Sequence, residues 1–261
     1  MKVALCLYGH LGLKSLASAR TSNSLVEEAA QADKMPRRSI EGLQRTLLDK
    51  YDTDVFIHSW SADKGGEIKD HYAPKKALVE TQTKFDCSLT PYGITDGPIE
   101  EWKISQSSKY GYELMLAGRP TMEAFKEALE REAFRSKSRW YSSQQSIQLK
   151  QKYELEHDFR YDFVLVSRFD CIFVKPFHLE NLDRTKFYGT PRSGRSDVDD
   201  ALQDFWFMSN SPNMDKFSSL YNHIHEYCIR PTFACRQHAE SCVGKDKIAY
   251  LLKHNVDYMK E

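Results

Sequence analysis

YDFVLVSRFD, residues 161–170, joins the most apolar run of the chain directly to a pair of charged residues. The run from Phe163 to Val166 is typical of a strand buried on both faces of a parallel sheet. Arg168 and Asp170 follow it. In open α/β sheets the ligand lies at the carboxyl ends of the strands. We therefore expect this pair either to line a site or to close a turn as a structural ion pair.

Apolar runs alternate with segments of helical periodicity on both sides of this stretch. This alternation predicts an α/β fold with a mostly parallel central sheet flanked by helices, and we interpret residues 1–261 as a single domain. The predicted strands are 2–8, 54–60, 161–166 with a continuation to 174, 187–189 and 205–208. The predicted helices start at Ser39 as N-cap, at Pro120 with a second helix after it, at Ser211 or Asn213 as N-cap, and at about Glu240, the last ending near His254.

Composition limits the classes of function. Hydrophobic residues make up 41% of the 261 residues, which is enough for a sizeable core. Lys plus Arg and Asp plus Glu both number 37, so the chain lacks the basic excess of proteins that bind nucleic-acid backbone. No apolar stretch reaches about eighteen residues, so no integral membrane segment is expected. Six scattered cysteines favour a reducing, cytoplasmic location.

A second group of charged residues is acidic. Asp204 directly precedes the apolar run 205–208, so a buried strand would hold its backbone rigidly while its carboxylate accepts a proton. Asp200 is the second candidate for this catalytic role. The alternative is a solvated acidic loop, and this interpretation is preferred for Asp197 and Asp199.

The end of the first strand offers a third signal, because Gly9 permits a ligand to approach the backbone closely. The chain has neither a GxGxxG fingerprint nor a GxxxxGK[ST] phosphate loop. Residues 10–36 are rich in Ser, Ala and Asn, and we expect a long, mobile loop that can act as a lid. The His and Cys residues between 223 and 242 have the types, but not the spacing, of a zinc site.

Five segments in this order resemble one family, the capsular-polysaccharide and viral glycosyltransferases with a single GT-A-type domain. They are VALCLYGHLG (3–12), DVFIHSW (54–60), WYSSQQSIQLKQKYE (140–154), YDFVLVSRFDCIF (161–173) and DFWFMSNSPNMDKFSSLY (204–221). The resemblance implies a Rossmann-like GT-A sheet. It also implies an enzyme of polysaccharide biosynthesis that moves a sugar from a nucleotide-sugar donor to an acceptor hydroxyl, on a glycan or another molecule.

The resemblance also implies which residues bind the nucleotide-sugar. The ends of the first two strands would hold the base and ribose through Leu7, Tyr8, Gly9, His10, His58, Ser59 and Trp60. The family's metal-binding DxD motif maps onto Arg168-Phe169-Asp170, so Asp170 is the one carboxylate left to hold Mn²⁺ or Mg²⁺, and Arg168 can share the neutralisation of the diphosphate. Tyr141, Ser142 and Gln145 either line the donor site or pack as a helix. Relatives read Asp-Gln where this chain reads Gln203-Asp204, so the choice of base between Asp200 and Asp204 stays open.

Two other functions fit the same fold. The incomplete DxD motif leaves open a non-catalytic domain that binds a nucleotide or carbohydrate. A nucleotide-sugar hydrolase would differ only in accepting water. In each case the expected partners are small molecules or glycans rather than nucleic acid, and the expected location is the cytoplasm (the host cytoplasm for a viral protein).

Overall fold

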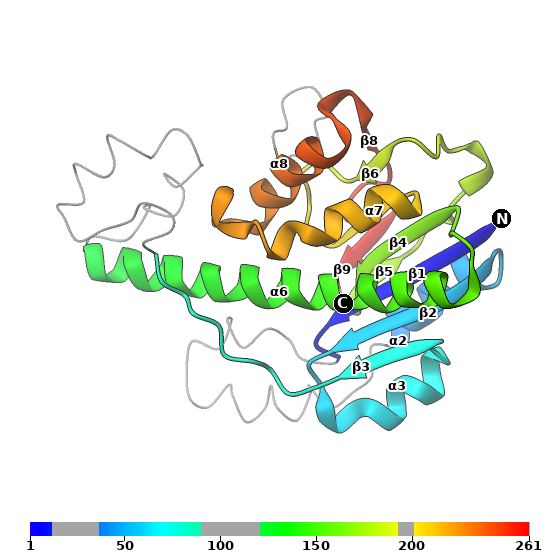
Figure 1. Cartoon of the computed structure of the whole chain (residues 1–261), viewed down its shortest axis with the longest axis horizontal. Coiled ribbons are helices and arrows are strands. Elements are labelled where there is room, and N and C mark those ends of the chain that lie inside the picture. Colours follow the sequence, from blue (N-terminus) through cyan, green and yellow to red (C-terminus); the bar gives the residue numbers. More distant parts are fainter. Residues whose placement is uncertain (12–36, 90–120, 193–200, 261) are drawn as a thin grey trace.

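The computed structural model of the protein describes residues 1–11, 37–89, 121–192 and 201–260. Its centre is a seven-stranded sheet with the strand order β3-β2-β1-β4-β7-β6-β8 (Figure 1). The strands are β1 (Lys2–Gly9), β2 (Asp52–Ser59), β3 (Lys76–Val79), β4 (Phe163–Arg168), β6 (Phe187–Gly189), β7 (Trp206–Ser209) and β8 (Ile248–Tyr250). Strands β3, β2, β1 and β4 are parallel, β7 runs antiparallel to both of its neighbours, and β6 and β8 are parallel. The predicted α/β fold with a mostly parallel central sheet is confirmed.

The helices cover both faces of this sheet. α6 (Met122–His157), α7 (Ser211–Phe217) and α8 (Pro231–Val243) contribute to one buried apolar cluster, whereas α2 (Arg37–Leu43) and α3 (Gly65–Tyr72) contribute to another. Alternate residues of β1 enter the two clusters, as the side-chain period of a strand requires. The strand is therefore buried on both faces, which explains its continuous apolar sequence.

The register of the parallel strands brings their carboxyl ends together. Tyr8 of β1 pairs with Arg168 of β4, and Gly9 pairs with Ser59 of β2. The backbone N–H of Arg168 also donates to the carbonyl of Phe205, 3.0 Å away, which places Asp204 beside the end of β4. Charged residues from distant parts of the sequence thus meet at one edge.

A second, two-stranded sheet lies at this edge. β5 (Cys171–Phe173) pairs antiparallel with β9 (Tyr258–Lys260). The pairing sets Lys260 opposite Cys171 and so beside Asp170. The sequence predicted residues 171–174 as a continuation of the central strand, which is wrong, because Phe169 and Asp170 form a turn between β4 and β5.

Several predicted helix boundaries are also wrong. α2 begins at Arg37, and Ser39 lies inside it, where its hydroxyl donates to the carbonyl of Cys171 at 2.8 Å instead of capping the helix. The two helices predicted after Pro120 are one helix, α6, capped by Thr121, whose side chain accepts from the N–H of Ala124. No Gly or Pro interrupts this helix.

The two last helices also differ from the prediction. The N-cap of α7 is Asn210, whose side chain accepts from the N–H of Asn213 at 2.9 Å, rather than Ser211 or Asn213. The helix predicted over 240–254 is wrong. α8 ends at Val243, because Gly244 leaves the helix with a φ of 89°, and residues 248–250 form β8 instead.

Within the residues that the structure describes, no helix has both the length and the apolar character that a membrane crossing requires. Residues 12–36 of the predicted lid, and Asp197, Asp199 and Asp200, lie outside the described residues.

Candidate functional site

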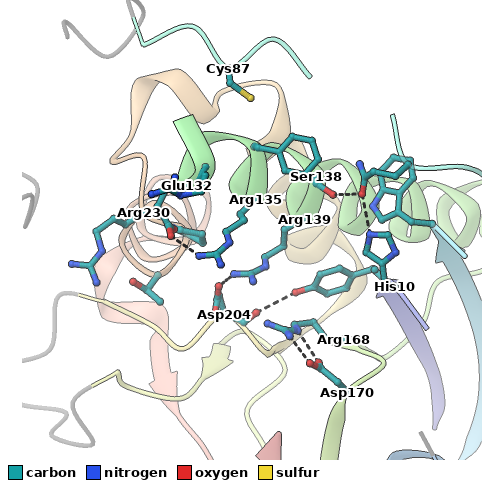
Figure 2. A pocket seen from close by; sticks show the side chains of 18 of the residues that line it. His10, Cys87, Glu132, Arg135, Ser138, Arg139, Arg168, Asp170, Asp204 and Arg230 are labelled. Carbon is teal, nitrogen blue, oxygen red and sulfur yellow. Dashed lines mark hydrogen bonds and ion pairs between the residues drawn. The ribbon is translucent and has the colours of Figure 1, made fainter. Parts of the chain in front are cut away.

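A pocket of about 840 Å³ opens at the carboxyl ends of β1, β2 and β4 (Figure 2). Its wall on one side is the first half of α6, and the start of α8 closes one end. The volume falls in the range of small-molecule sites, roughly 300–1,000 Å³. Of the residues that the sequence singled out, it brings together Tyr8, Gly9, His10, Trp60, Arg168, Asp170 and Asp204.

Gly9 makes the turn that ends β1. Its φ of 106° lies in a region that other residues rarely adopt. Its N–H donates to Ser142 Oγ at 2.8 Å, and its carbonyl accepts from the N–H of Trp60 at 3.1 Å. The turn thereby ties β1 to α6 and to the end of β2, and it fixes the position of the next residue, His10.

His10 presents an unpaired acceptor nitrogen. Its Nε2 lies 3.1 Å from Gln82 Oε1, which also accepts from the hydroxyl of Ser138 at 2.9 Å, while Gln82 Nε2 donates to the carbonyl of Thr83. Because the amide oxygen can only accept, His10 Nε2 must carry the proton, and Nδ1 is left with a lone pair. Burial lowers the pKa of His10, so the ring is neutral at pH 7. Nδ1 is buried and has no hydrogen-bond partner among the residues that the structure describes.

Trp60 supplies an unpaired donor close to the same end. Its ring stacks on Tyr141 with a centroid distance of 5.3 Å and an interplanar angle of 21°. Its Nε1–H is buried without a hydrogen-bond partner in the described parts of the chain. An orphaned donor and an orphaned acceptor, both in residues that line the pocket, indicate that a polar ligand completes this end.

Arg168 and Asp170 form a two-point ion pair at the end of β4. Arg168 Nε donates to Asp170 Oδ1 at 2.8 Å, and Nη2 donates to Oδ2 at 2.5 Å. Burial opposes the charge of the Arg168 guanidinium, but the charge and hydrogen bonds of Asp170 outweigh it and raise the pKa. The guanidinium also lies over the ring of Phe205, 5.1 Å from its centroid. Lys260 Nζ approaches Asp170 Oδ2 to 3.7 Å.

Asp204 is held in a second ion pair, with Arg139 of α6. The residue is 8% exposed, and its backbone carbonyl accepts from the hydroxyl of Tyr8 at 3.3 Å. Burial raises the pKa of Tyr8 to about 12, so this hydroxyl keeps its proton. Burial, followed by the nearby charge of Arg168, lowers the pKa of Arg139 to about 10. Asp204 therefore lines the pocket with its backbone held by Tyr8, but its carboxylate is already paired with the Arg139 guanidinium.

The remaining residues from the sequence lie beneath or outside the pocket. The side chain of Leu7 is in the apolar core. His58 and Ser142 are fully buried and bonded at 2.6 Å (Nδ1 to Oγ), and His58 Nε2 lies 3.0 Å from Glu80 Oε1. Ser59 Oγ accepts from the N–H of Ser61 at 3.2 Å. These residues are buried beneath the pocket, and Tyr141 stacks on Trp60 without lining the pocket itself. Gln145 is on α6 and does not line the pocket.

Sequence reasoning missed most of the arginines in the pocket. Arg131, Arg135 and Arg139 are spaced four residues apart on α6 and so share one face, a signal that was available in the sequence. Figure 2 shows Arg135, Glu132 and Arg230 at the opposite end of the pocket from His10. Lys260 gave no signal, because its place depends on the pairing of β9 with β5.

A divalent cation does not fit this arrangement at Asp170. Both carboxylate oxygens already bind Arg168, and the charged Nζ of Lys260 lies 3.7 Å from Asp170 Oδ2. Mn²⁺ and Mg²⁺ require several oxygen ligands and are repelled by cationic neighbours. Over the described residues, no three His, Cys, Asp or Glu side chains come together in a way that can hold a metal ion.

Comparison with known proteins identifies no family for this chain. The sequence matches no protein-family profile and no curated protein at a significant level. Among solved structures, the chain is similar to the apo form of mouse xyloside xylosyltransferase 1. The similarity covers 96% of this chain and 85% of that one, with a TM-score of 0.38 and 9% sequence identity. A likeness at this level carries no information on activity.

Proposed function

We propose that the protein is a glycosyltransferase that moves a sugar from a nucleotide-sugar donor to the hydroxyl of an acceptor, on a glycan or another molecule. The observation that carries the proposal is a charged cluster. Arg168 ends the central strand β4, Asp170 follows it, and both line a pocket of about 840 Å³. The ion pair of Arg139 with Asp204 lines the same pocket as the ion pair of Arg168 with Asp170. The carboxyl end of a central strand is where open α/β sheets bind nucleotides.

The polar groups in the pocket follow the order of the parts of a nucleotide-sugar. The end with His10 and Trp60 offers one acceptor, one donor and aromatic surface, which suits a base and ribose. Arg139 and Arg168 lie next along the pocket, where a diphosphate would sit. Glu132 and Arg135 line the far end, which leaves room for the sugar and the acceptor (Figure 2).

In the proposed reaction, the acceptor oxygen forms a bond to the anomeric carbon of the sugar while the bond from that carbon to the diphosphate breaks. Guanidinium groups stabilise the negative charge that develops on the leaving diphosphate. Asp204 takes the proton of the acceptor hydroxyl, since its carboxylate lies between the diphosphate region and the far end (Figure 2). Asp200, outside the described residues, is the second candidate for this base.

A catalytic role for Asp204 requires that Arg139 release it. The two are paired in the structure, so an acceptor hydroxyl and the guanidinium compete for the same carboxylate. A diphosphate carries more negative charge than one carboxylate and can draw Arg139 away. Donor binding would thus uncover the base only when a sugar is ready for transfer.

The test is a screen of nucleoside diphosphates and their sugars by thermal shift, followed by an assay of transfer and of hydrolysis with each ligand that binds. A donor that binds the folded state raises its melting temperature by mass action. Transfer to sugar acceptors supports the proposal. Hydrolysis alone would identify a nucleotide-sugar hydrolase, and binding without either reaction would identify a binding domain. If no member of the set binds, the proposed function is wrong.

A further inference from the structure

We propose that Arg139, Arg168 and Lys260 bind and neutralise the donor diphosphate without a divalent cation, and that Asp170 positions this cationic clamp instead of holding a metal ion. The inference rests on the proposed function and specifies how the donor is held. It also separates this chain from the metal-dependent arrangement that its partial DxD motif suggests.

The clamp comes from three separate elements. Arg139 lies on α6, Arg168 ends β4 and Lys260 ends β9, and all three line the same pocket. The pairing of β9 with β5 brings Lys260 within 3.7 Å of Asp170 Oδ2. Asp170 therefore contacts two members of the clamp, Arg168 through two hydrogen bonds and Lys260 through its charge.

The charges around Asp170 favour an anion as the ligand. Among the described residues, the carboxylates of Asp170 and Asp204 form ion pairs with Arg139, Arg168 and Lys260, and Glu132 acts on Arg139 without an ion pair. The three cations also act on one another, since the charge of Arg168 contributes to the lowered pKa values of both Arg139 and Lys260, after burial as the main cause. A diphosphate would relieve this mutual repulsion, whereas Mn²⁺ would increase it.

The chemistry of the groups fits the role. A guanidinium offers paired N–H donors that match two phosphate oxygens, and Lys supplies a compact charge on a flexible stem. Together they can perform the task that a divalent ion performs elsewhere, which is to stabilise the charge of the leaving diphosphate. Asp170 and the ring of Phe205 already orient the Arg168 side chain, so this side chain loses little conformational entropy when the ligand binds.

The experiment measures binding of inorganic pyrophosphate and of a set of nucleoside diphosphates to the full chain by calorimetry. Each titration is run once in EDTA and once in Mn²⁺. The variants are Arg168→Gln, Lys260→Gln, Arg139→Gln and Asp170→Asn. The matched control is Lys253→Gln, because this exposed lysine lies in the same C-terminal segment but does not line the pocket. Circular dichroism and the melting temperature establish that each variant folds.

We expect binding in EDTA, weakened about tenfold or more by Arg168→Gln and by a smaller factor in Lys260→Gln and Arg139→Gln. Lys253→Gln should bind like the native protein. Asp170→Asn gives the sharpest result, because a metal site predicts that binding is lost and a clamp predicts that it is kept. Removing this carboxylate from a clamp removes a charge that repels the diphosphate, but it also removes the contact that orients Arg168. These two effects oppose each other, so binding in EDTA should persist.

Two outcomes would overturn the inference. Binding that requires Mn²⁺ and is lost in Asp170→Asn would show a metal site, and it would leave the proposed glycosyltransferase function intact. A failure of pyrophosphate and of every nucleoside diphosphate to bind, with and without Mn²⁺, would overturn both proposals. If one of the variants does not fold, the comparison of ligand binding by the native protein in EDTA and in Mn²⁺ still distinguishes the cationic clamp from a metal site.

Discussion

Arg139 of α6 and Asp204, the residue two before β7, form an ion pair across the pocket. The pair links the helix that covers the site to the loop that carries the candidate base. Tyr8 strengthens the same link, since its hydroxyl donates to the backbone carbonyl of Asp204. The backbone contact with Tyr8 thus positions Asp204, whereas the ion pair with Arg139 determines whether its carboxylate can accept a proton. Mutations can separate these two properties.

Asp204→Asn keeps the shape of the side chain and removes its basicity. We expect the rate of sugar transfer to fall by about 10² to 10⁴-fold, the usual effect of losing a general base. Donor binding should stay the same or tighten, because Arg139 no longer has a carboxylate to pair with. The two quantities are measured by initial rates and by calorimetry.

Glu132→Gln is the matched control, since it removes a carboxylate that lines the same pocket and pairs with Arg135. It should lower the rate far less than Asp204→Asn does. If Asp204→Asn weakens donor binding and leaves the rate of bound complex unchanged, Asp204 is a binding residue and Asp200 becomes the better candidate for the base.

His10→Phe tests the acceptor end of the base and ribose site. The substitution keeps an aromatic ring and removes Nδ1, the unpaired acceptor. We expect affinity for a nucleoside diphosphate to fall by about threefold to tenfold, the value of one neutral hydrogen bond. Affinity for inorganic pyrophosphate should not change, because pyrophosphate has no base or ribose. His71→Phe, at an exposed position on α3, is the control. An equal loss for both ligands would place His10 at the diphosphate instead.

The sheet could be predicted because its signal is local. Residues 163–166 and 3–8 are continuous apolar runs, and the structure buries them on both faces. The carboxyl ends of parallel strands meet at one edge of the sheet, which predicts Tyr8, His10 and Arg168 at the site, whereas Trp60 is predicted through the family resemblance. Residues within the strands were less certain. His58 and Ser59 precede Trp60 directly, yet they are fully buried beneath the pocket.

The clamp could not be predicted in the same way. Lys260 reaches Asp170 only because β9 pairs with β5, a contact between distant segments that leaves no periodic pattern. Arg139 was within reach of sequence reasoning, since three arginines recur at intervals of four, but splitting α6 into two helices hid this face. Gly244 was likewise a visible stop signal for α8, and continuing the helix past it led to the wrong assignment of 248–250.

Gly9→Ala should destabilise the protein through its backbone alone. Apart from its two chain neighbours, no atom of the described residues lies within 4 Å of the place a Cβ would take, so the cost arises from the φ of 106° and not from a clash. We expect the free energy of unfolding in urea to fall by about 1–2 kcal/mol. Gly66→Ala provides a control of opposite sign, because Gly66 lies in α3 with equally open space and a helical backbone. This change should raise the free energy of unfolding by roughly 0.5–1 kcal/mol. Equal effects at the two positions would refute the explanation by φ.

His238 is a buried histidine that does not line the candidate pocket. It lies on α8 and is 3% exposed, with Nδ1 3.0 Å from the hydroxyl of Tyr227 and Nε2 3.3 Å from Ser219 Oγ. Burial lowers its pKa from 6.5 to about 4. Between these two values the unfolded chain binds a proton that the folded protein does not, so the free energy of unfolding must decrease as the pH falls through this window.

His238→Gln should therefore flatten the pH dependence of stability. From the ordinary and lowered pKa values, His238 accounts for about 2 kcal/mol of the stability lost between pH 7 and pH 5. Urea unfolding at several pH values measures this slope in the native protein and the variant. The variant loses the polar contacts of His238 with Tyr227, Ser219 and Cys242 and so starts from a lower stability, but the slope of stability against pH reports titration and not packing. His225→Gln, the same substitution at an exposed position, is run beside it for comparison. The burial of His10 and His58 lowers their pKa values in the same direction, so some slope will persist in His238→Gln. An unaltered slope in this variant would mean that His238 has the same pKa in the folded and unfolded states.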